Sequence, residues 1–295
     1  MREAAVVDEM LVAAKAVRIT FEDVPTPPAC VREAGDVEPQ EATEIIERYA
    51  RHGFVIIQVG SRCPPPEALR ALTEALSLGE PFVPPLYATG NYVGGTISRI
   101  SAAVVGEGAH PSFEGTGGLE FHCDGTLQPI GYVKASALLC ESPGVEGGES
   151  TLFNAAAAYA ELAGGDVAAA AALATEGVLT RQANINGRTD MNVGPAFAVR
   201  DGQLACNYSV TATDRWNLEA GVDEADLRRG VDFLRRASEP GSPFFLKLGL
   251  GAGQAILMDN SRISHGRTPY RNSDAQRRCL YRSLHLHHPR VRALA

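Results

Sequence analysis

The stretch Leu119-Glu120-Phe121-His122-Cys123-Asp124-Gly125 combines a strand-like pattern with two side chains that bind metals. Side chains two positions apart on a β-strand lie on the same face, so we expect His122 and Asp124 to project together while Cys123 points away. Gly125 is expected to end the strand and turn the chain. One imidazole and one carboxylate are two of the three ligands of a 2-His-1-carboxylate site. Such a site leaves coordination positions open on the bound metal.

We expect the third ligand near the other end of the chain. An apolar strand from Ala255 to Met258 leads into the polar turn Asp259-Asn260, and His265 follows just before a glycine. His265 would complete the metal site with His122. Because the two parts of this site are far apart in sequence, they favour one closed domain over two independent ones.

A second strand-like pattern runs from Arg278 to Leu284, and it places Arg278 and Arg282 on one face. Arginine is always charged and presents a planar fork that grips a carboxylate through two parallel bonds. An inward-facing arginine on a core strand is costly unless an anion meets it. This pattern predicts a bound anion, and a structural salt bridge is the alternative.

Four motifs in this order resemble the taurine dioxygenase (TauD/TfdA) family of iron(II)- and 2-oxoglutarate-dependent oxygenases. They are His-x-Asp, Gly147-Gly148-Glu149-Ser150-Thr151, the Asp-Asn-x-Arg-x-x-His segment that ends at His265, and Gln276-Arg277-Arg278. The resemblance covers residues from about Gly118 to Leu286, in pieces. The residues just before His122 do not match the substrate-contacting pattern of taurine dioxygenase itself, so we expect a substrate other than taurine.

The resemblance implies a role for each matching residue. His122, Asp124 and His265 match the iron ligands. Arg278 matches the arginine that pairs with the distal carboxylate of 2-oxoglutarate, and Thr151 matches a hydroxyl that helps bind it. Arg282 matches a position that can hold an anionic group of the primary substrate.

The implied cofactors are Fe(II), 2-oxoglutarate as co-substrate, and O2. The expected reaction is hydroxylation of an unactivated C–H bond, and desaturation or cyclisation are alternative outcomes of the same chemistry. The expected substrate is a small polar molecule with an anionic group, such as an amino acid or a derivative used in bacterial specialised metabolism. Two rival functions are a zinc-dependent hydrolase that uses the same His/Asp/His site and a jelly-roll binding protein without activity.

The composition restricts the kinds of partner that this protein can bind. The chain has 295 residues and a net charge of −8, which argues against binding to nucleic acid or to an anionic membrane. The expected partner is a small-molecule substrate, and the charge does not exclude a homo-oligomer. Its six cysteines contain no C-x-x-C pair, which fits reduced thiols in a cytoplasmic protein. No uncharged apolar run is long enough to cross a bilayer.

The pattern of elements predicts a mainly β fold with flanking helices, and the resemblance implies a double-stranded β-helix (jelly roll) like that of clavaminate synthase. We expect a helix over 40–52, a strand over 54–59, a strand over 91–101 and a hairpin formed by 244–250 and 254–258. The whole of 1–295 is expected to be one domain with a helical insertion at about 154–175. The Gly-rich loop over 102–118, which contains His110, is a candidate lid.

Overall fold

The computed structural model describes residues 2–17, 19–22, 24, 27–85, 92–102, 115–185 and 188–291. Most of the candidate lid, including His110, lies outside these residues.

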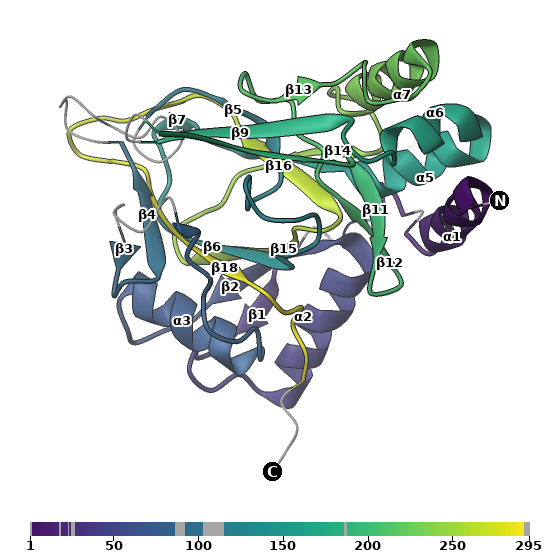
Figure 1. Cartoon of the computed structure of the whole chain (residues 1–295). Coiled ribbons are helices and arrows are strands. Elements are labelled where there is room, and N and C mark those ends of the chain that lie inside the picture. The colour runs from purple at the N-terminus through teal and green to yellow at the C-terminus, as the bar shows by residue number, and fades with distance from the viewer. Residues whose placement is uncertain are drawn as a thin grey trace.

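Two stacked sheets form the centre of the molecule (Figure 1). The larger sheet contains, in spatial order, β1 (Ala29–Val31), β2 (Phe54–Val59), β15 (Gln254–Asp259), β6 (Ala135–Ser142), β18 (Cys279–His285), β4 (Ile97–Ser101) and β3 (Tyr92–Val93). The smaller sheet contains β14 (Phe245–Leu248), β8 (Ser150–Asn154), β16 (Ile263–Arg267) and β5 (Leu119–His122). One buried apolar cluster joins them: Ile100, Met258 and Leu280 come from the larger sheet, and Leu152 and Ile263 from the smaller. The predicted jelly roll is therefore confirmed.

Two helices cover the outer face of the larger sheet, α2 (Pro39–His52) and α3 (Pro65–Ala75). Their buried residues, such as Ile45 and Leu69, form one cluster with Ile57 and Leu257 of the sheet. The apolar spacing of α2 predicts this helix, and Gly53 ends it in the left-handed conformation with a φ of 77°.

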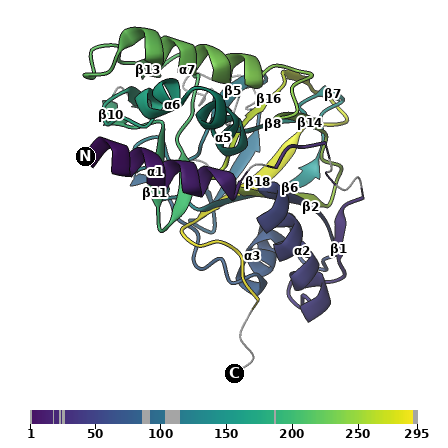
Figure 2. The ribbon, with the colours of Figure 1, turned by 90° about the vertical axis from the view of Figure 1, so that its right-hand side faces the viewer.

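Four helices gather on another side of the molecule (Figure 2). They are α1 (Arg2–Lys15), α5 (Ala155–Gly165), α6 (Val167–Leu173) and α7 (Glu224–Ala237). The small side chains of α5 and α6 let the helices approach closely: a Cβ at Gly230 of α7 would lie 2.9 Å from the Leu173 side chain. The helices expected at about 154–175 are thus present, while their origin as an insertion into one domain stays a prediction.

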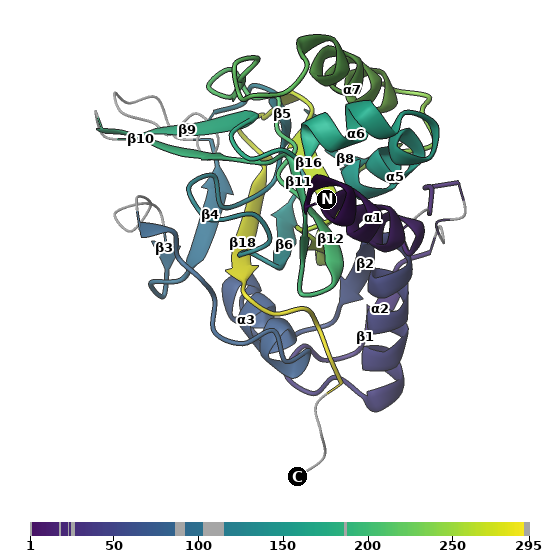
Figure 3. The same cartoon turned by 45° about the vertical axis from the view of Figure 1, so that its right-hand side comes forward.

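Smaller pieces of sheet complete the fold. They are β9 (Leu179–Ile185), β10 (Arg188–Gly194) and β13 (Arg215–Trp216); β11 (Phe197–Arg200) with β12 (Gln203–Cys206); and β7 (Glu146–Gly147) with β17 (Tyr270–Arg271). Figure 3 shows the β9–β10 ribbon extending away from the helices. Asp201 and Gly202 join β11 to β12 with φ angles of 53° and 73°, as in a type I′ hairpin turn.

Three local predictions were wrong. β14 and β15 do not form a hairpin, because β14 pairs with β8 of the smaller sheet while β15 pairs with β2 and β6 of the larger. The segment 91–101 contains two short strands, β3 and β4, that pair with each other around Gly94 and Gly95. The strand that carries His122 ends at His122 itself, before Asp124. A turn signal between two apolar runs cannot distinguish a hairpin from a crossover between sheets.

None of the described helices is long and apolar enough to cross a membrane.

Candidate active site

His122 and His265 face each other across two neighbouring strands. They are direct partners in the β5–β16 pairing, and their ring centroids lie 4.6 Å apart. Asp124 lies beside them, with its Oδ2 3.5 Å from His265 Nε2. One ligand atom from each residue lies within 4.8 Å of the others, and among the described residues this is the one His, Cys, Asp or Glu cluster with metal-binding geometry. The fold thus brings the three predicted ligands together.

Asp124 reaches this position through a side-chain amide rather than through strand alternation. The Asp124 backbone N–H donates to Oδ1 of Asn260 at 2.8 Å, and Asn260 Nδ2 donates back to the Asp124 carbonyl at 3.1 Å. The preceding carbonyl, of Cys123, accepts a 2.6 Å hydrogen bond from the buried Arg181. These contacts fix the backbone between the two ligands after the strand has ended.

The Asp124 carboxylate is held at both oxygens. Arg282 Nη1 lies 2.6 Å from Oδ1, and the Ser136 hydroxyl donates to Oδ2 at 2.5 Å. Burial by itself would raise the pKa of Asp124, but Arg282, the two histidines and Ser136 outweigh it and hold that pKa well below its usual range. The carboxylate is therefore ionised at neutral pH.

Both histidines are neutral at neutral pH. Burial is the main cause that lowers the pKa of His122, and burial together with nearby cations lowers the pKa of His265 to about 3, despite Asp124. His122 Nδ1 lies 2.9 Å from the Glu120 carbonyl, so a proton on Nδ1 leaves Nε2 free to bind a metal. Two neutral imidazoles and one carboxylate fit a divalent iron ion with open coordination positions.

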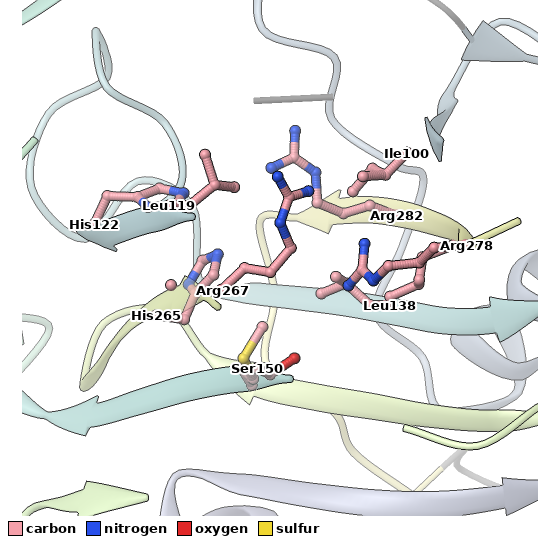
Figure 4. Close-up of a pocket in the computed structure, with 12 residues that line it drawn as sticks. Ile100, Leu119, His122, Leu138, Ser150, His265, Arg267, Arg278 and Arg282 are labelled. Carbon is pink, nitrogen blue, oxygen red and sulfur yellow. The ribbon is translucent and has the colours of Figure 1, made fainter. Parts of the chain in front are cut away.

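A cavity opens beside the candidate ligands (Figure 4). It is lined by Ile100, Leu119, His122, Leu138, Ser150, Met258, His265, Gly266, Arg267, Arg278, Leu280 and Arg282. In Figure 4 the two histidines lie on one side, Arg278 and Arg282 lie on the other, and Arg267 extends between them. The cavity is apolar except at the metal ligands, one serine and three arginines.

Arg278 is buried in this wall, 5% exposed. Its Nη2 donates to the Gly148 carbonyl at 3.2 Å, its guanidinium carbon lies 5.0 Å from the centre of the Tyr270 ring, and its Nη1 has no hydrogen-bond partner among the described residues. Gly148 is required at this point, because a Cβ there would lie 2.8 Å from Arg278 Nε. Arg278 can therefore receive an anion from the cavity.

The hydroxyl nearest this position in the cavity wall belongs to Ser150. Thr151 does not line the cavity; it pairs with Gly266, and a Cβ at Gly266 would lie 2.8 Å from its Oγ1. Ser150 pairs with Arg267 and shares its face of the sheet, since side chains alternate along a strand. The structure thus brings Arg278 and Arg282 to the metal site but leaves Thr151 on the other face of β8.

Sequence reasoning missed Ser136, Arg181 and Arg267. Ser136 and Arg181 lie in strands that read as ordinary core segments, so no local signal identifies them. Arg267 follows His265 by two positions on β16, and this spacing places it on the same face as the proposed metal ligand, although no strand was predicted there.

Comparison with known proteins agrees with this geometry. Residues 26–284 match the protein-family model described as "Taurine catabolism dioxygenase TauD, TfdA family". A uridine-5′-phosphate dioxygenase of an Amycolatopsis species is 36% identical over 265 residues, covering 90% of this chain and 96% of the relative. A second uridine-5′-phosphate dioxygenase, from a Streptomyces species, is 31% identical over 86% of this chain and 92% of its own. The non-heme iron oxygenase OrfP, solved with Fe and alpha-ketoglutaric acid, shares the fold at 19% identity, with a TM-score of 0.62 over 97% of this chain and 91% of OrfP.

Proposed function

This chain belongs to the TauD/TfdA family of dioxygenases, and from that premise we propose that it uses iron(II), 2-oxoglutarate and O2 to oxidise a C–H bond of uridine 5′-phosphate or a closely similar nucleoside monophosphate. The proposed substrate rests on the sequence similarity to two proteins named for that activity, which extends over most of all three chains. Hydroxylation is the proposed outcome.

In this proposal His122, Asp124 and His265 hold the iron. Bound iron and 2-oxoglutarate supply the oxidising chemistry, with succinate and carbon dioxide as the products of the co-substrate. Arg278 pairs with the distal carboxylate of 2-oxoglutarate, and Ser150 is the hydroxyl placed to assist it, in the role that the resemblance gives to Thr151. The apolar wall, which includes Leu138 and Met258, keeps bulk water away from the reacting carbon.

The charge of the cavity supports an anionic substrate. Three arginines line the cavity and bound iron(II) would add two positive charges, while the metal ligands contribute one carboxylate. The dianion 2-oxoglutarate alone would leave about two positive charges unbalanced, and a phosphate monoester, which carries close to two negative charges, would balance them. A nucleoside monophosphate is one kind of the small polar, anionic substrate expected from the sequence, and its phosphate suits this charge better than the single carboxylate of an amino acid. Arg282 stays a candidate for a second contact to the substrate anion, in addition to its pairing with Asp124.

The test is a succinate assay with purified iron(II)-loaded protein, 2-oxoglutarate and O2. We expect uridine 5′-phosphate to be consumed in step with succinate formation and the nucleotide to gain mass or break down. Asp124→Ala should abolish this turnover, while Asp274→Ala, which changes an exposed carboxylate, should not. Consumption of the nucleotide without O2 or 2-oxoglutarate would favour the metal-dependent hydrolase instead.

A further inference from the structure

Arg267 is a buried cation for which the described part of the chain provides no counter-charge. It lies two residues after His265 on β16, is 6% exposed and lines the cavity. Its Nη2 donates to the carbonyls of Gly115 and Gly117 at 3.0 and 2.6 Å. Among the residues that the structure describes, its Nε and Nη1 have no hydrogen-bond partner and no carboxylate forms an ion pair with it. Three of its five N–H bonds are thus left unsatisfied.

This arrangement is costly in the protein alone. Arg267 and Arg278 are both buried in the same wall, 6% and 5% exposed. Both guanidinium groups lie against the Tyr270 ring, with their carbons 4.9 and 5.0 Å from its centre. An aromatic ring attracts a cation but compensates only partly for lost hydration. Because an arginine side chain stays charged in proteins, an anion from outside the protein would relieve the site.

The other two arginines that line the cavity have partners in this scheme. Arg282 pairs with Asp124, and Arg278 is the proposed partner of 2-oxoglutarate. Arg267 is the lining arginine that remains as the main contact for the substrate anion. We propose that Arg267 binds the phosphate group of the nucleotide substrate and selects phosphorylated over unphosphorylated nucleosides, an inference that rests on the proposed function.

The placement of Arg267 agrees with this role. His265 and Arg267 share one face of β16, and two residues of strand advance roughly 6.6 Å. In Figure 4 the Arg267 side chain extends from the histidine side across the cavity. A phosphate held there would keep a ribose carbon, which is only a few bonds away, within reach of the metal. The two glycine carbonyls orient the guanidinium without neutralising it.

The test compares substrates with and without the phosphate. We would measure kcat/KM for uridine 5′-phosphate and for uridine in the full-length, iron-loaded wild type, Arg267→Met and Arg267→Lys. We expect the ratio of the two values to fall roughly 10- to 100-fold in Arg267→Met, because hydrogen bonds to a charged phosphate are lost, and to recover in part in Arg267→Lys. The exposed Arg277→Met is the matched control and should keep the wild-type ratio. Equal losses for both substrates would mean that Arg267 only holds the 115–117 segment, and would overturn the proposal.

A binding measurement separates this inference from the proposed function. We expect inorganic phosphate to raise the melting temperature of the iron- and 2-oxoglutarate-loaded wild type under anaerobic conditions, and to have less effect on Arg267→Met or Arg267→Lys. If the wild type binds phosphate but does not oxidise uridine 5′-phosphate, the proposed substrate is wrong while the anion subsite stands. If phosphate gives no shift in the wild type, the subsite is wrong, whatever the enzyme oxidises. The absence of a shift in the wild type needs no variant to overturn the proposal, and a shift that Arg267→Lys reduces assigns the phosphate to Arg267.

Discussion

Arg282 Nη1 lies 2.6 Å from Asp124 Oδ1, and the two side chains are only 11% and 4% exposed. A proposed iron ligand is therefore already paired with a cation before any metal enters. Arg282 holds Oδ1, and Oδ2 is the oxygen that lies 3.5 Å from His265 Nε2. Arg282 therefore orients a proposed metal ligand in addition to lining the cavity.

Removing Arg282 should destabilise the metal-free protein. Arg282→Gln leaves a buried carboxylate without its cation, which costs about 3 kcal/mol of unfolding free energy. Added iron(II) should restore more stability to this variant than to the wild type, because the metal replaces the lost positive charge. Urea unfolding under anaerobic conditions, with and without iron(II), measures both effects. The exposed Arg277→Gln is the control, and equal stability of Arg282→Gln and wild type without metal would contradict the structural role.

Substitution of Arg278 should weaken binding of the co-substrate. We expect Arg278→Met to raise the KM for 2-oxoglutarate roughly 100-fold, since it removes a charge-assisted pair that is shielded from water. Arg277→Met changes the neighbouring exposed arginine and should leave this KM at the wild-type value. The readouts are succinate formation and the weak visible absorption that 2-oxoglutarate gives on binding to iron(II) without oxygen. An unaltered KM in Arg278→Met would make Arg278 a structural residue.

Substitutions of Ser150 and of Thr151 should affect the binding of 2-oxoglutarate to different extents. Ser150 lines the cavity and Thr151 lies on the other face of β8, so Ser150→Ala should raise the KM for 2-oxoglutarate about tenfold and Thr151→Ala should change it much less. The two variants differ only in position and serve as each other's control. A larger effect from Thr151→Ala would support the role that the resemblance assigns to it.

The metal-free protein should lose stability as the pH falls below neutrality. His285 is buried, His122 and His265 are partly buried beside the cavity, and the loss of hydration lowers the pKa of each, to about 3 for His265 and about 4 for His285. Below pH 6.5 the unfolded chain takes up protons that the folded chain does not, so stability is present above that pH and falls by about 1.4 kcal/mol per pH unit for each histidine.

Urea unfolding at pH 7, 6 and 5 measures this slope. His285→Gln should reduce it by about one proton, because His285 lies away from the metal and is held by the Gly79 carbonyl and the Ser283 hydroxyl. His287→Gln, which changes an exposed ring, is the matched control. Unchanged stability from pH 7 to 5 would show that these histidines are protonated in the folded protein.

The sequence by itself determined several local elements and the candidate metal ligands. The apolar spacing of α2, the run that forms β2 and the amphipathic pattern of α7 depend on neighbours within one element, so they are visible in the chain. His122, Asp124, His265 and Arg278 were proposed as site residues in the same way, because each lies in a short motif whose chemistry has few alternatives, and the fold places the first three close enough together to hold a metal. Local sequence patterns were sufficient for these predictions, and the observed jelly-roll fold is consistent with them.

The tertiary structure alone decided how the remaining charges are paired. Three features depend on strands that are far apart in sequence. They are the sheets that β14 and β15 join, the position that Asn260 gives to Asp124, and the choice between Ser150 and Thr151 as the side chain that faces the cavity. The same holds for Arg267 and Arg282, which are both ordinary strand arginines in the chain. Only packing gives Arg282 a carboxylate, whereas Arg267 has none among the described residues. Burial and charge pairing are properties of the folded packing, since they depend on which side chains the fold brings within a few ångströms of one another.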